Sequence, residues 1–379
     1  MHAQIVPARL RKLPAQMNAP PRRRIVISLG DIGSLDHGLG EFALQLGTRI
    51  AAQAPAWRER YGIAIDFHLR RPLAGLFGDA VGYLPVSRWH RHRHRLAQPC
   101  ALWHSLHQLN KNLPPNMEAG GPRLVTVHDL NYVYGRNAYS RWRHHRRTRA
   151  LMRRTDLVVA ISRHTAGDVR QHLAWQGPLE LIYNGARSLV TAPREPLPGW
   201  AAEGTPPFLF HLSRMSPSKN PLAIIELARA WPAMNFVLCG PPGDDARALQ
   251  AAHRLPNLQF HLGISDAQKA WAYAQCTGFL FPSLAEGFGL PPIEAMHFGK
   301  PVFLARRTCL PEIGGAAADY FDDFEPASMQ RVVQAGLERR ARPGHAQFIQ
   351  AHAAQFDWDR TAEAYLALYR RLLGLQPPA

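Results

Sequence analysis

The stretch that most constrains the fold of this chain is residues 278–300, which read GFLFPSLAEGFGLPPIEAMHFGK. It begins with an apolar run over 278–282 that is short enough for a buried strand of a parallel sheet. A glycine-rich polar turn follows, and Pro291 and Pro292 then stand where a helix would begin. Proline is tolerated in a first helical turn because that N–H has no partner within the helix. The stretch therefore predicts a strand, a tight loop and a helix N-terminus.

The loop in this stretch combines glycines with two carboxylates. Glycines let the backbone approach a ligand, and the free N–H groups and the helix dipole favour an anion. Glu286 and Glu294, with seven residues between them, do not suit a site for phosphate alone, because like charges repel. Carboxylates do accept hydrogen bonds from hydroxyl groups. The loop therefore indicates a ligand with both phosphate and many hydroxyls, such as a nucleotide sugar.

The residue pattern of this loop resembles a known motif. EGFGLP at 286–291, followed by EAM at 294–296, is similar to the Glu-x7-Glu signature of the retaining GT-B glycosyltransferases of family 4. The resemblance implies that Glu286 faces the transferred sugar and that Glu294 binds the ribose hydroxyls. The backbone that would meet the donor diphosphate belongs to Gly287, Phe288, Gly289 and Leu290. A glycine loop of some other doubly wound domain, with a solvated Glu294, is the alternative.

A second motif follows an expected strand at 208–212. Arg214 and Lys219 resemble the family's pair of cations that neutralises the donor diphosphate. Fixed cations stabilise the negative charge that grows on a leaving diphosphate, so this pair is chemically reasonable. No Asp-x-Asp pair stands at a strand end in position to hold a metal. We therefore expect a metal-independent reaction, with no metal ligands and no cofactor.

Two features of the first half extend the resemblance. Glycines follow an expected strand at 24–29, helical spacing follows at 41–51, and Gly38 and Gly40 are carried over as residues near the donor phosphates and the acceptor. An ordinary tight turn is the alternative. His128 stands in a His-Asp-Leu sequence at the end of the strand expected at 123–130. The resemblance implies that His128 contacts the donor sugar, whereas a structural hydrogen bond is the alternative.

The order of the expected elements predicts an α/β protein. Strands alternate with helices, which implies parallel sheets with ligands at the carboxyl ends of the strands. By resemblance we expect the GT-B fold, with two doubly wound, Rossmann-like domains facing across a cleft. Residues 1–188 would bind the acceptor, with 1–23 flexible, and residues 207–357 would bind the nucleotide sugar. Residues 358–379 would form a helix that crosses back to the first domain.

The charge of the chain is distributed unevenly. The net charge is +17, and residues 1–189 hold 28 Lys and Arg against 11 Asp and Glu. This asymmetry suggests that the first half meets an anionic partner. Two basic segments stand out, 88–95 and 140–154. The alternating histidines of 88–95 could bind a metal, but the interleaved arginines would repel a cation, so we predict an exposed basic surface there. Segment 140–154 predicts a helix with either a solvated face or a face toward an anion or a membrane.

Other features of the composition limit the cellular setting. The four cysteines are far apart in apolar surroundings, so buried free thiols are expected. No run of eighteen apolar residues predicts a membrane-spanning helix, and residues 1–23 lack the apolar core of a signal peptide. We therefore expect a cytoplasmic chain, with peripheral contact to the anionic inner face of the membrane.

The predicted activity is transfer of a sugar from a GDP- or UDP-sugar, mannosyl donors included, to an acceptor hydroxyl with retention. The partners expected are the nucleotide-sugar donor and an anionic, lipid-linked glycan acceptor of lipopolysaccharide or exopolysaccharide assembly. Other GT-B enzymes, such as a nucleotide-sugar epimerase or a phosphorylase, are the alternatives. Binding to nucleic acid would explain the charge, but it leaves Glu286 and Glu294 without a role, so no nucleic-acid partner is expected.

Overall fold

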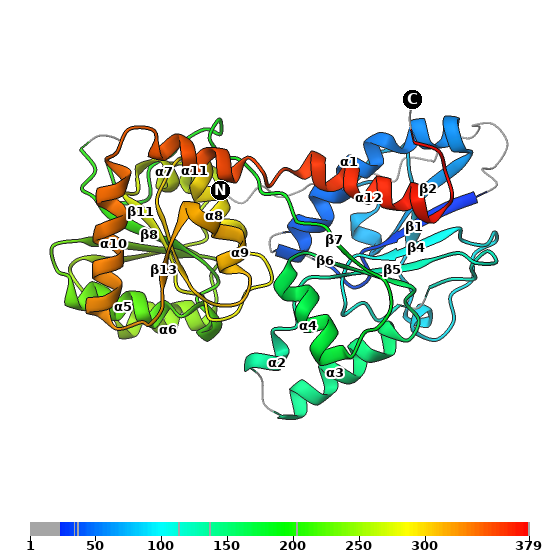
Figure 1. Ribbon diagram of the computed structural model, residues 1–379, viewed down its shortest axis with the longest axis horizontal. Helices are drawn as coiled ribbons and strands as arrows, with labels where there is room; N and C mark the ends of the chain where they lie inside the picture. The colour runs from blue at the N-terminus through cyan, green and yellow to red at the C-terminus, as the bar shows by residue number, and fades with distance from the viewer. Residues whose placement is uncertain are drawn as a thin grey trace.

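A computed structural model describes residues 23–33, 35, 38–112, 114–135, 138–201 and 204–377. Of the segment expected to be flexible, 1–23, all but Arg23 lies outside the described residues. The described chain forms two α/β units, each with helices packed on a central parallel sheet (Figure 1).

The first unit is built on a sheet that has seven strands within the described part of the chain, all paired in parallel. Its strands are β1 (Arg23–Ser28), β2 (Ile63–Leu69), β3 (Gly82–Pro85), β4 (Leu102–Ser105), β5 (Arg123–Val127), β6 (Leu157–Ala160) and β7 (Leu179–Leu181). Its helices are α1 (Gly38–Tyr61), α2 (Tyr132–Gly135), α3 (Ala138–Met152) and α4 (Arg163–Leu173), with short 3-10 turns η1 (Arg71–Leu73) and η2 (Arg88–Arg91). The sheet order is β3-β2-β1-β4-β5-β6-β7.

The second unit is built on a sheet with six parallel strands among the described residues. Its strands are β8 (Phe208–Leu212), β9 (Asn235–Gly240), β10 (Leu258–Leu262), β11 (Gly278–Phe281), β12 (Val302–Ala305) and β13 (Ala318–Phe321). Its helices are α5 (Pro221–Ala230), α6 (Asp244–Ala252), α7 (Asp266–Gln275), α8 (Leu290–His297), α9 (Leu310–Gly314), α10 (Pro326–Arg340) and α11 (His345–Ala353), with η3 (Pro217–Lys219) and η4 (Gly315–Ala317). The sheet order is β10-β9-β8-β11-β12-β13.

Both sheets are doubly wound, which confirms the α/β prediction. In each one the strand order reverses beside the first strand, between β1 and β4 and between β8 and β11. Ligands of open α/β sheets bind outside the carboxyl ends of the strands at this reversal. The segment 213–220 follows β8 and the segment 282–289 follows β11, so the two predicted donor motifs flank the same reversal point.

The last helix, α12 (Trp358–Leu372), belongs by its packing to the first unit (Figure 1). Its buried Trp358, Tyr365 and Tyr369 lie in the same apolar core as Phe42 of α1. The Tyr365 hydroxyl lies 2.9 Å from Thr126 Oγ1 of β5, so the helix is also joined to the sheet by a buried polar contact. The chain therefore passes between the units a second time, just before residue 358.

The structure differs from the sequence prediction in a few elements. The helix expected at 41–51 begins at Gly38 and continues to Tyr61, beyond Pro55, because Ala54 and Trp57 are buried against the core. Strand β13 and helices α6, α7, α10 and α11 were not predicted; β13 is only four residues long and partly exposed. Among the described residues the four cysteines are buried free thiols, as expected.

Candidate active site

The loop after β11 is held by its neighbours rather than free. The backbone N–H of Glu286 donates to Thr308 Oγ1 at 3.2 Å, and Cys309 Sγ lies 3.3 Å from the carbonyls of Glu286 and Phe288. Gly289 has φ of 96°, a left-handed conformation that favours glycine, and it caps the start of α8. The loop is therefore fixed in shape before any ligand arrives.

Gly287 marks the place where the two units approach each other. A Cβ atom at this position would lie 2.0 Å from the carbonyl oxygen of His128, which follows β5 of the first unit. Such a distance is far inside van der Waals contact, so only glycine fits here. The carboxyl ends of the two sheets thus meet at this loop.

Charged groups from both units gather beside this contact. Lys219 Nζ lies 2.5 Å from Glu286 Oε1, and both side chains are largely buried. Burial raises the pKa of Asp129; Glu286 raises that pKa further, and Lys219 and Arg214 lower it, so these four groups share one electrostatic environment. The Arg214 side chain is exposed, and no hydrogen bond or ion pair found among the described residues uses it. Asp129 was not predicted as a site residue, although its place directly after His128 could have suggested it.

His128 is buried, and its ring is already engaged. Its Nε2 lies 2.7 Å from the carbonyl oxygen of Leu106, so the hydrogen is on Nε2 and is donated there. Burial lowers the pKa of His128 to about 4, so the ring is neutral at neutral pH. The ring packs edge-on against Phe42, with centroids 4.5 Å apart. Its backbone N–H donates to Gln108 Oε1 at 3.2 Å, and its carbonyl accepts from the Thr165 hydroxyl at 3.3 Å. What His128 can offer a ligand is therefore its Nδ1 lone pair.

Glu294 lies in a second group of charges, on α8. Its Oε2 accepts a hydrogen bond of 2.8 Å from the buried hydroxyl of Tyr273, and burial raises the pKa of its carboxyl group. Arg187, on the connection between the units, lies 3.7 Å from Glu41 of α1 and 3.1 Å from Asp266 of α7, and it also acts on Glu294. No sequence pattern pointed to Arg187, because its partners are distant in the chain.

The remaining predicted site residues lie around these two groups. Gly38 and Gly40 are the first and third residues of α1 rather than loop residues, and a Cβ atom added to Gly38 would meet no other atom within 4 Å. The Phe288 side chain is buried and packs edge-on against Phe356, with centroids 5.7 Å apart, so it offers a ligand only its backbone. Leu290 is the first residue of α8.

The structure thus brings one set of predicted residues together and places the rest nearby. Arg214, Lys219, Glu286, Gly287 and the end of β5 with His128 meet at one point. Glu294 lies apart from the Lys219–Glu286 pair, near the start of α1. Cations, buried carboxylates and helix N-termini in this arrangement suit a ligand that carries both phosphate and hydroxyl groups.

Comparison with family models identifies both halves of the chain. The model described as "Glycosyl transferases group 1" matches residues 197–321, and the model described as "Glycosyltransferase Family 4" matches residues 52–187. The second match ends and the first begins on either side of the connection between the two sheets.

Curated relatives match part of the chain. The mannosyltransferase WbdA of Escherichia coli is 31% identical over 182 residues, which are 44% of this chain and 22% of WbdA. A D-inositol 3-phosphate glycosyltransferase of Mycolicibacterium paratuberculosis is 28% identical over 228 residues, 53% of this chain and 49% of that protein. The matches thus span about a fifth to a half of these relatives.

Solved structures resemble the whole fold. Sucrose-phosphate synthase of Thermosynechococcus elongatus superposes with a TM-score of 0.70 over 93% of this chain and 100% of its own, at 18% identity. Anabaena HepE in complex with UDP gives a TM-score of 0.66 over 92% and 100% of the two chains, at 15% identity. The chain has two Rossmann-like units, and a glycosyltransferase family model matches each half. It therefore belongs to the family 4 glycosyltransferases and has the GT-B fold.

Proposed function

We propose that this chain transfers a sugar from a nucleotide-sugar donor to an acceptor hydroxyl with retention of the anomeric configuration, without a metal ion. The observation that carries the proposal is the buried Lys219–Glu286 pair beside the exposed Arg214, at the reversal point of the second sheet. Cations at this place would stabilise the leaving diphosphate, which is the task a metal performs in other enzymes.

The remaining residues take roles around the donor. Glu286 would face the transferred sugar, and the backbone of 287–290 would meet the diphosphate. His128 would contact the sugar through Nδ1, since its Nε2 donates to Leu106 and its backbone groups bond to Gln108 and Thr165. Glu294 would accept hydrogen bonds from the ribose; one of its oxygens is already held by Tyr273. Gly38 and Gly40 would let the donor phosphates approach the start of α1.

The donor is a GDP- or UDP-sugar in this proposal. Similarity to WbdA, a mannosyltransferase, favours a mannosyl donor. The structural likeness to HepE, which was solved with UDP, makes a UDP-sugar the alternative donor. We assign the reaction to the assembly of a bacterial surface polysaccharide, such as lipopolysaccharide or exopolysaccharide.

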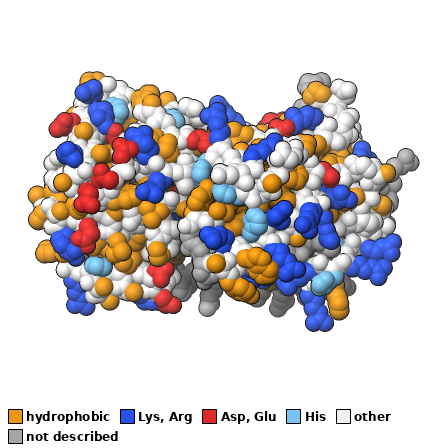
Figure 2. Space-filling view, turned by 60° about the horizontal axis from the view of Figure 1, so that its bottom comes forward, with side chains coloured by type: hydrophobic (Ala, Val, Ile, Leu, Met, Phe, Trp, Pro, Cys, Tyr) orange, Lys and Arg blue, Asp and Glu red, His pale blue; other side chains and the backbone are white. Residues whose placement is uncertain are grey.

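The acceptor would bind to the first unit, residues 1–188, while residues 207–357 hold the donor. Figure 2 shows acidic side chains mainly over the second unit, on the left, whereas basic side chains dominate the right-hand part of this face. Such a charge distribution suits an anionic, lipid-linked acceptor and peripheral contact with a membrane on its cytoplasmic side. In the part of the chain that the structure describes, no helix has the length and apolar character needed to span a bilayer.

The proposal is tested by replacing the diphosphate cations. A thermal-shift screen of nucleotide sugars first identifies the donor, because a bound ligand stabilises the folded state. With that donor, Arg214→Ala and Lys219→Ala are each expected to lower kcat/KM by roughly 10²–10³-fold, the scale for losing one charge-stabilising group. Arg229→Ala, which removes an exposed arginine paired within α5, serves as the control and should leave turnover unchanged.

Three results would overturn parts of this assignment. Full turnover in both single variants removes Arg214 and Lys219 from the site. Dependence of the transfer step on added Mg²⁺ or Mn²⁺ after chelation contradicts the metal-independent mechanism. Release of an epimerised nucleotide sugar, or of a sugar phosphate from a glycan, would identify an epimerase or a phosphorylase instead.

A further inference from the structure

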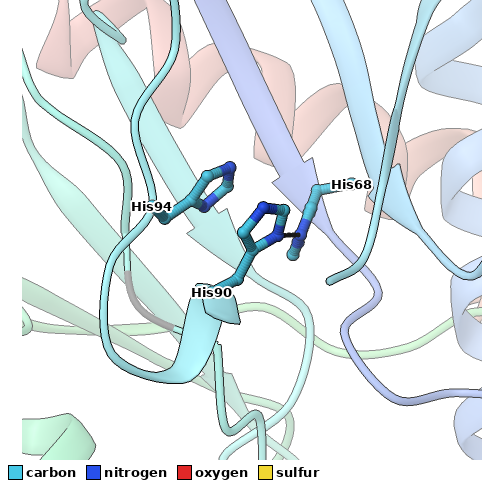
Figure 3. A group of neighbouring side chains, drawn as sticks. All are labelled: His68, His90 and His94. Atoms are coloured by element: carbon cyan, nitrogen blue, oxygen red, sulfur yellow. Dashed lines mark hydrogen bonds between the residues drawn. The ribbon is translucent and has the colours of Figure 1, made fainter. Parts of the chain in front are cut away.

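Three histidines converge at the carboxyl end of β2. They are His68 near the end of β2, His90 on η2, and His94 in the segment that follows (Figure 3). Each offers a ring nitrogen, and these nitrogens all lie within 4.8 Å of one another. Nε2 of His68 lies 2.9 Å from Nδ1 of His90, and the rings of His90 and His94 stack with centroids 3.9 Å apart.

The prediction of an exposed basic surface over 88–95 therefore holds only for part of the segment. Arg88, Arg91, Arg93 and Arg95 are exposed, whereas His94 is 6% exposed and His90 is half-buried. Along this segment the arginine side chains thus point into solvent, whereas the imidazoles of two histidines point toward the protein interior. Charges that stand in water are screened, so the repulsion expected from the interleaved arginines is weaker than the sequence suggested.

The imidazoles are electronically suited to a metal. An ordinary imidazole has a pKa of about 6.5, so histidine side chains are mostly neutral at neutral pH. A neutral imidazole has one nitrogen with a free electron pair, which is the form that binds a metal.

Hydrogen bonds behind the cluster orient it, as outer partners commonly do in metal sites. His68 Nδ1 lies 2.9 Å from the Ser28 hydroxyl, which in turn accepts a hydrogen bond of 2.8 Å from Asn110 Nδ2. A hydroxyl can accept a hydrogen as well as donate one, so Ser28 can support the tautomer of His68 in which Nε2 is free for a metal. Trp103, 1% exposed, closes the base of the cluster against His68 and His94.

We propose that His68, His90 and His94 form a binding site for one divalent zinc ion, with a fourth position left to water. Zn²⁺ prefers nitrogen ligands at about 2.0–2.1 Å in tetrahedral geometry, which places ligand nitrogens roughly 3.3 Å apart. His68 Nε2 and His90 Nδ1, 2.9 Å apart, need only move apart slightly, and His94 must move closer. To use Nδ1 as a ligand, His90 gives up the hydrogen bond of 3.2 Å that this atom accepts from the Ser87 N–H. The half-buried His90 leaves a path for the ion to enter. A bound ion would fasten η2 and the segment after it to the end of β2.

The test is stoichiometric metal binding by the full chain without a polyhistidine tag, after dialysis against EDTA. Zn²⁺ is titrated against a competing chelator, the bound metal is counted by mass spectrometry, and Co²⁺ replaces it to report tetrahedral coordination in the visible spectrum. We expect one tightly bound equivalent, and affinity at least about 100-fold lower in His90→Ala and in His94→Phe, which keeps the ring stack.

His92→Ala is the matched control, because His92 lies in the same segment and is exposed. It should bind zinc as the unchanged chain does. If His94→Phe does not fold, as judged by circular dichroism, the zinc affinity of His90→Ala, a change on the half-buried turn η2, decides whether the site exists. Unchanged affinity in His90→Ala, or a lack of any stoichiometric zinc in the unchanged chain, would overturn the proposal, as would selective uptake of Ni²⁺ or Cu²⁺ with zinc excluded.

Discussion

At the scale of single residues, the two motif carboxylates occupy different environments. Glu286 is paired with Lys219 at 2.5 Å, while Glu294 shares its oxygen with the Tyr273 hydroxyl and lies near Arg187. In the proposed mechanism, a carboxylate paired with a cation lies where charge develops on the donor during sugar transfer. A carboxylate held by a neutral hydroxyl is positioned to accept further hydrogen bonds from hydroxyls.

Replacing each carboxylate by its amide should therefore give different kinetic results. Glu294→Gln is expected to raise the KM for donor by roughly tenfold, because in the proposed role the ribose would lose one hydrogen bond to a charged group. Glu286→Gln is expected mainly to lower kcat, because in the proposed mechanism Glu286 faces the transferred sugar, and the change leaves the Lys219 charge without a counter-charge. Steady-state kinetics with the identified donor measure both. Equal and mild effects from the two variants would mean that the loop is only structural.

How far these residues could be predicted depends on whether their signal was local. Glu286 and Glu294 stand in one motif, and Arg214 and Lys219 follow one strand, so sequence spacing alone suggested them. Arg187 acts through Glu41 and Asp266, which are far away in the chain, and no spacing reveals such a contact. The burial of His90 and His94 was missed for the same reason, because their partner His68 is on another element.

At the scale of elements, α3 combines arginines with exposed aromatic rings. Tyr139 and Trp142 are 70% and 56% exposed and stack on each other, and Arg146 lies over the Trp142 ring at 5.6 Å. Aromatic and basic side chains on one surface are typical of segments that lie at a membrane interface. This feature favours a membrane-facing helix over a solvated one.

A charge-neutralised α3 tests this interpretation. Changing Arg143, Arg146, Arg147 and Arg149 together to Gln should weaken binding to anionic vesicles at least tenfold, since each basic residue near such a surface contributes about 1 kcal/mol. Vesicle sedimentation at low and physiological salt measures the change, and donor affinity should not change. The matched control changes four exposed arginines of the second unit: Arg229, Arg247, Arg331 and Arg342. If both quadruple variants sediment alike, α3 has no special role.

Elements with strong local patterns were the ones predicted well. The buried strand β8 has the predicted bounds, because an apolar run between turn residues marks it clearly. The end of α1 was missed because proline usually ends a helix, whereas here the burial of Trp57 maintains it past Pro55. A contact of this kind, between residues far apart in the chain, cannot be recognised from a short stretch of sequence.

At the scale of the whole molecule, one carboxylate ties the two units together. Glu312 of α9 accepts hydrogen bonds from the backbone N–H groups of Arg163 and His164, at 2.7 and 3.2 Å, which begin α4 of the first unit. It also accepts a hydrogen bond of 2.6 Å from the Tyr183 hydroxyl. Burial, together with this hydrogen bond, raises the pKa of Tyr183 to about 12. A carboxylate is favourable at a helix N-terminus, so this contact stabilises the arrangement with the units close together.

Removing this carboxylate should shift the molecule toward open arrangements. Glu312→Ala loses charge-assisted hydrogen bonds of about 1.5–3 kcal/mol, discounted for partial exposure, so we expect roughly a tenfold change in the closed-to-open ratio. Small-angle scattering should show a larger radius of gyration, and the KM for donor should rise. Glu226→Ala, at an exposed pair within α5, is the control. Identical scattering from the two variants would show that Glu312 does not set the domain arrangement.

The packing of α12 has a consequence for how the chain is made. The core of the first unit contains Trp358, Tyr365 and Tyr369, which are translated long after β7 is complete. At about 5–20 residues per second, the nascent first unit waits roughly ten to forty seconds for them. During that time Phe42 and Leu46 of α1 lack part of their cover. The core of the first unit is therefore completed only after the second unit has been synthesised, and part of its apolar surface stays uncovered in the interval.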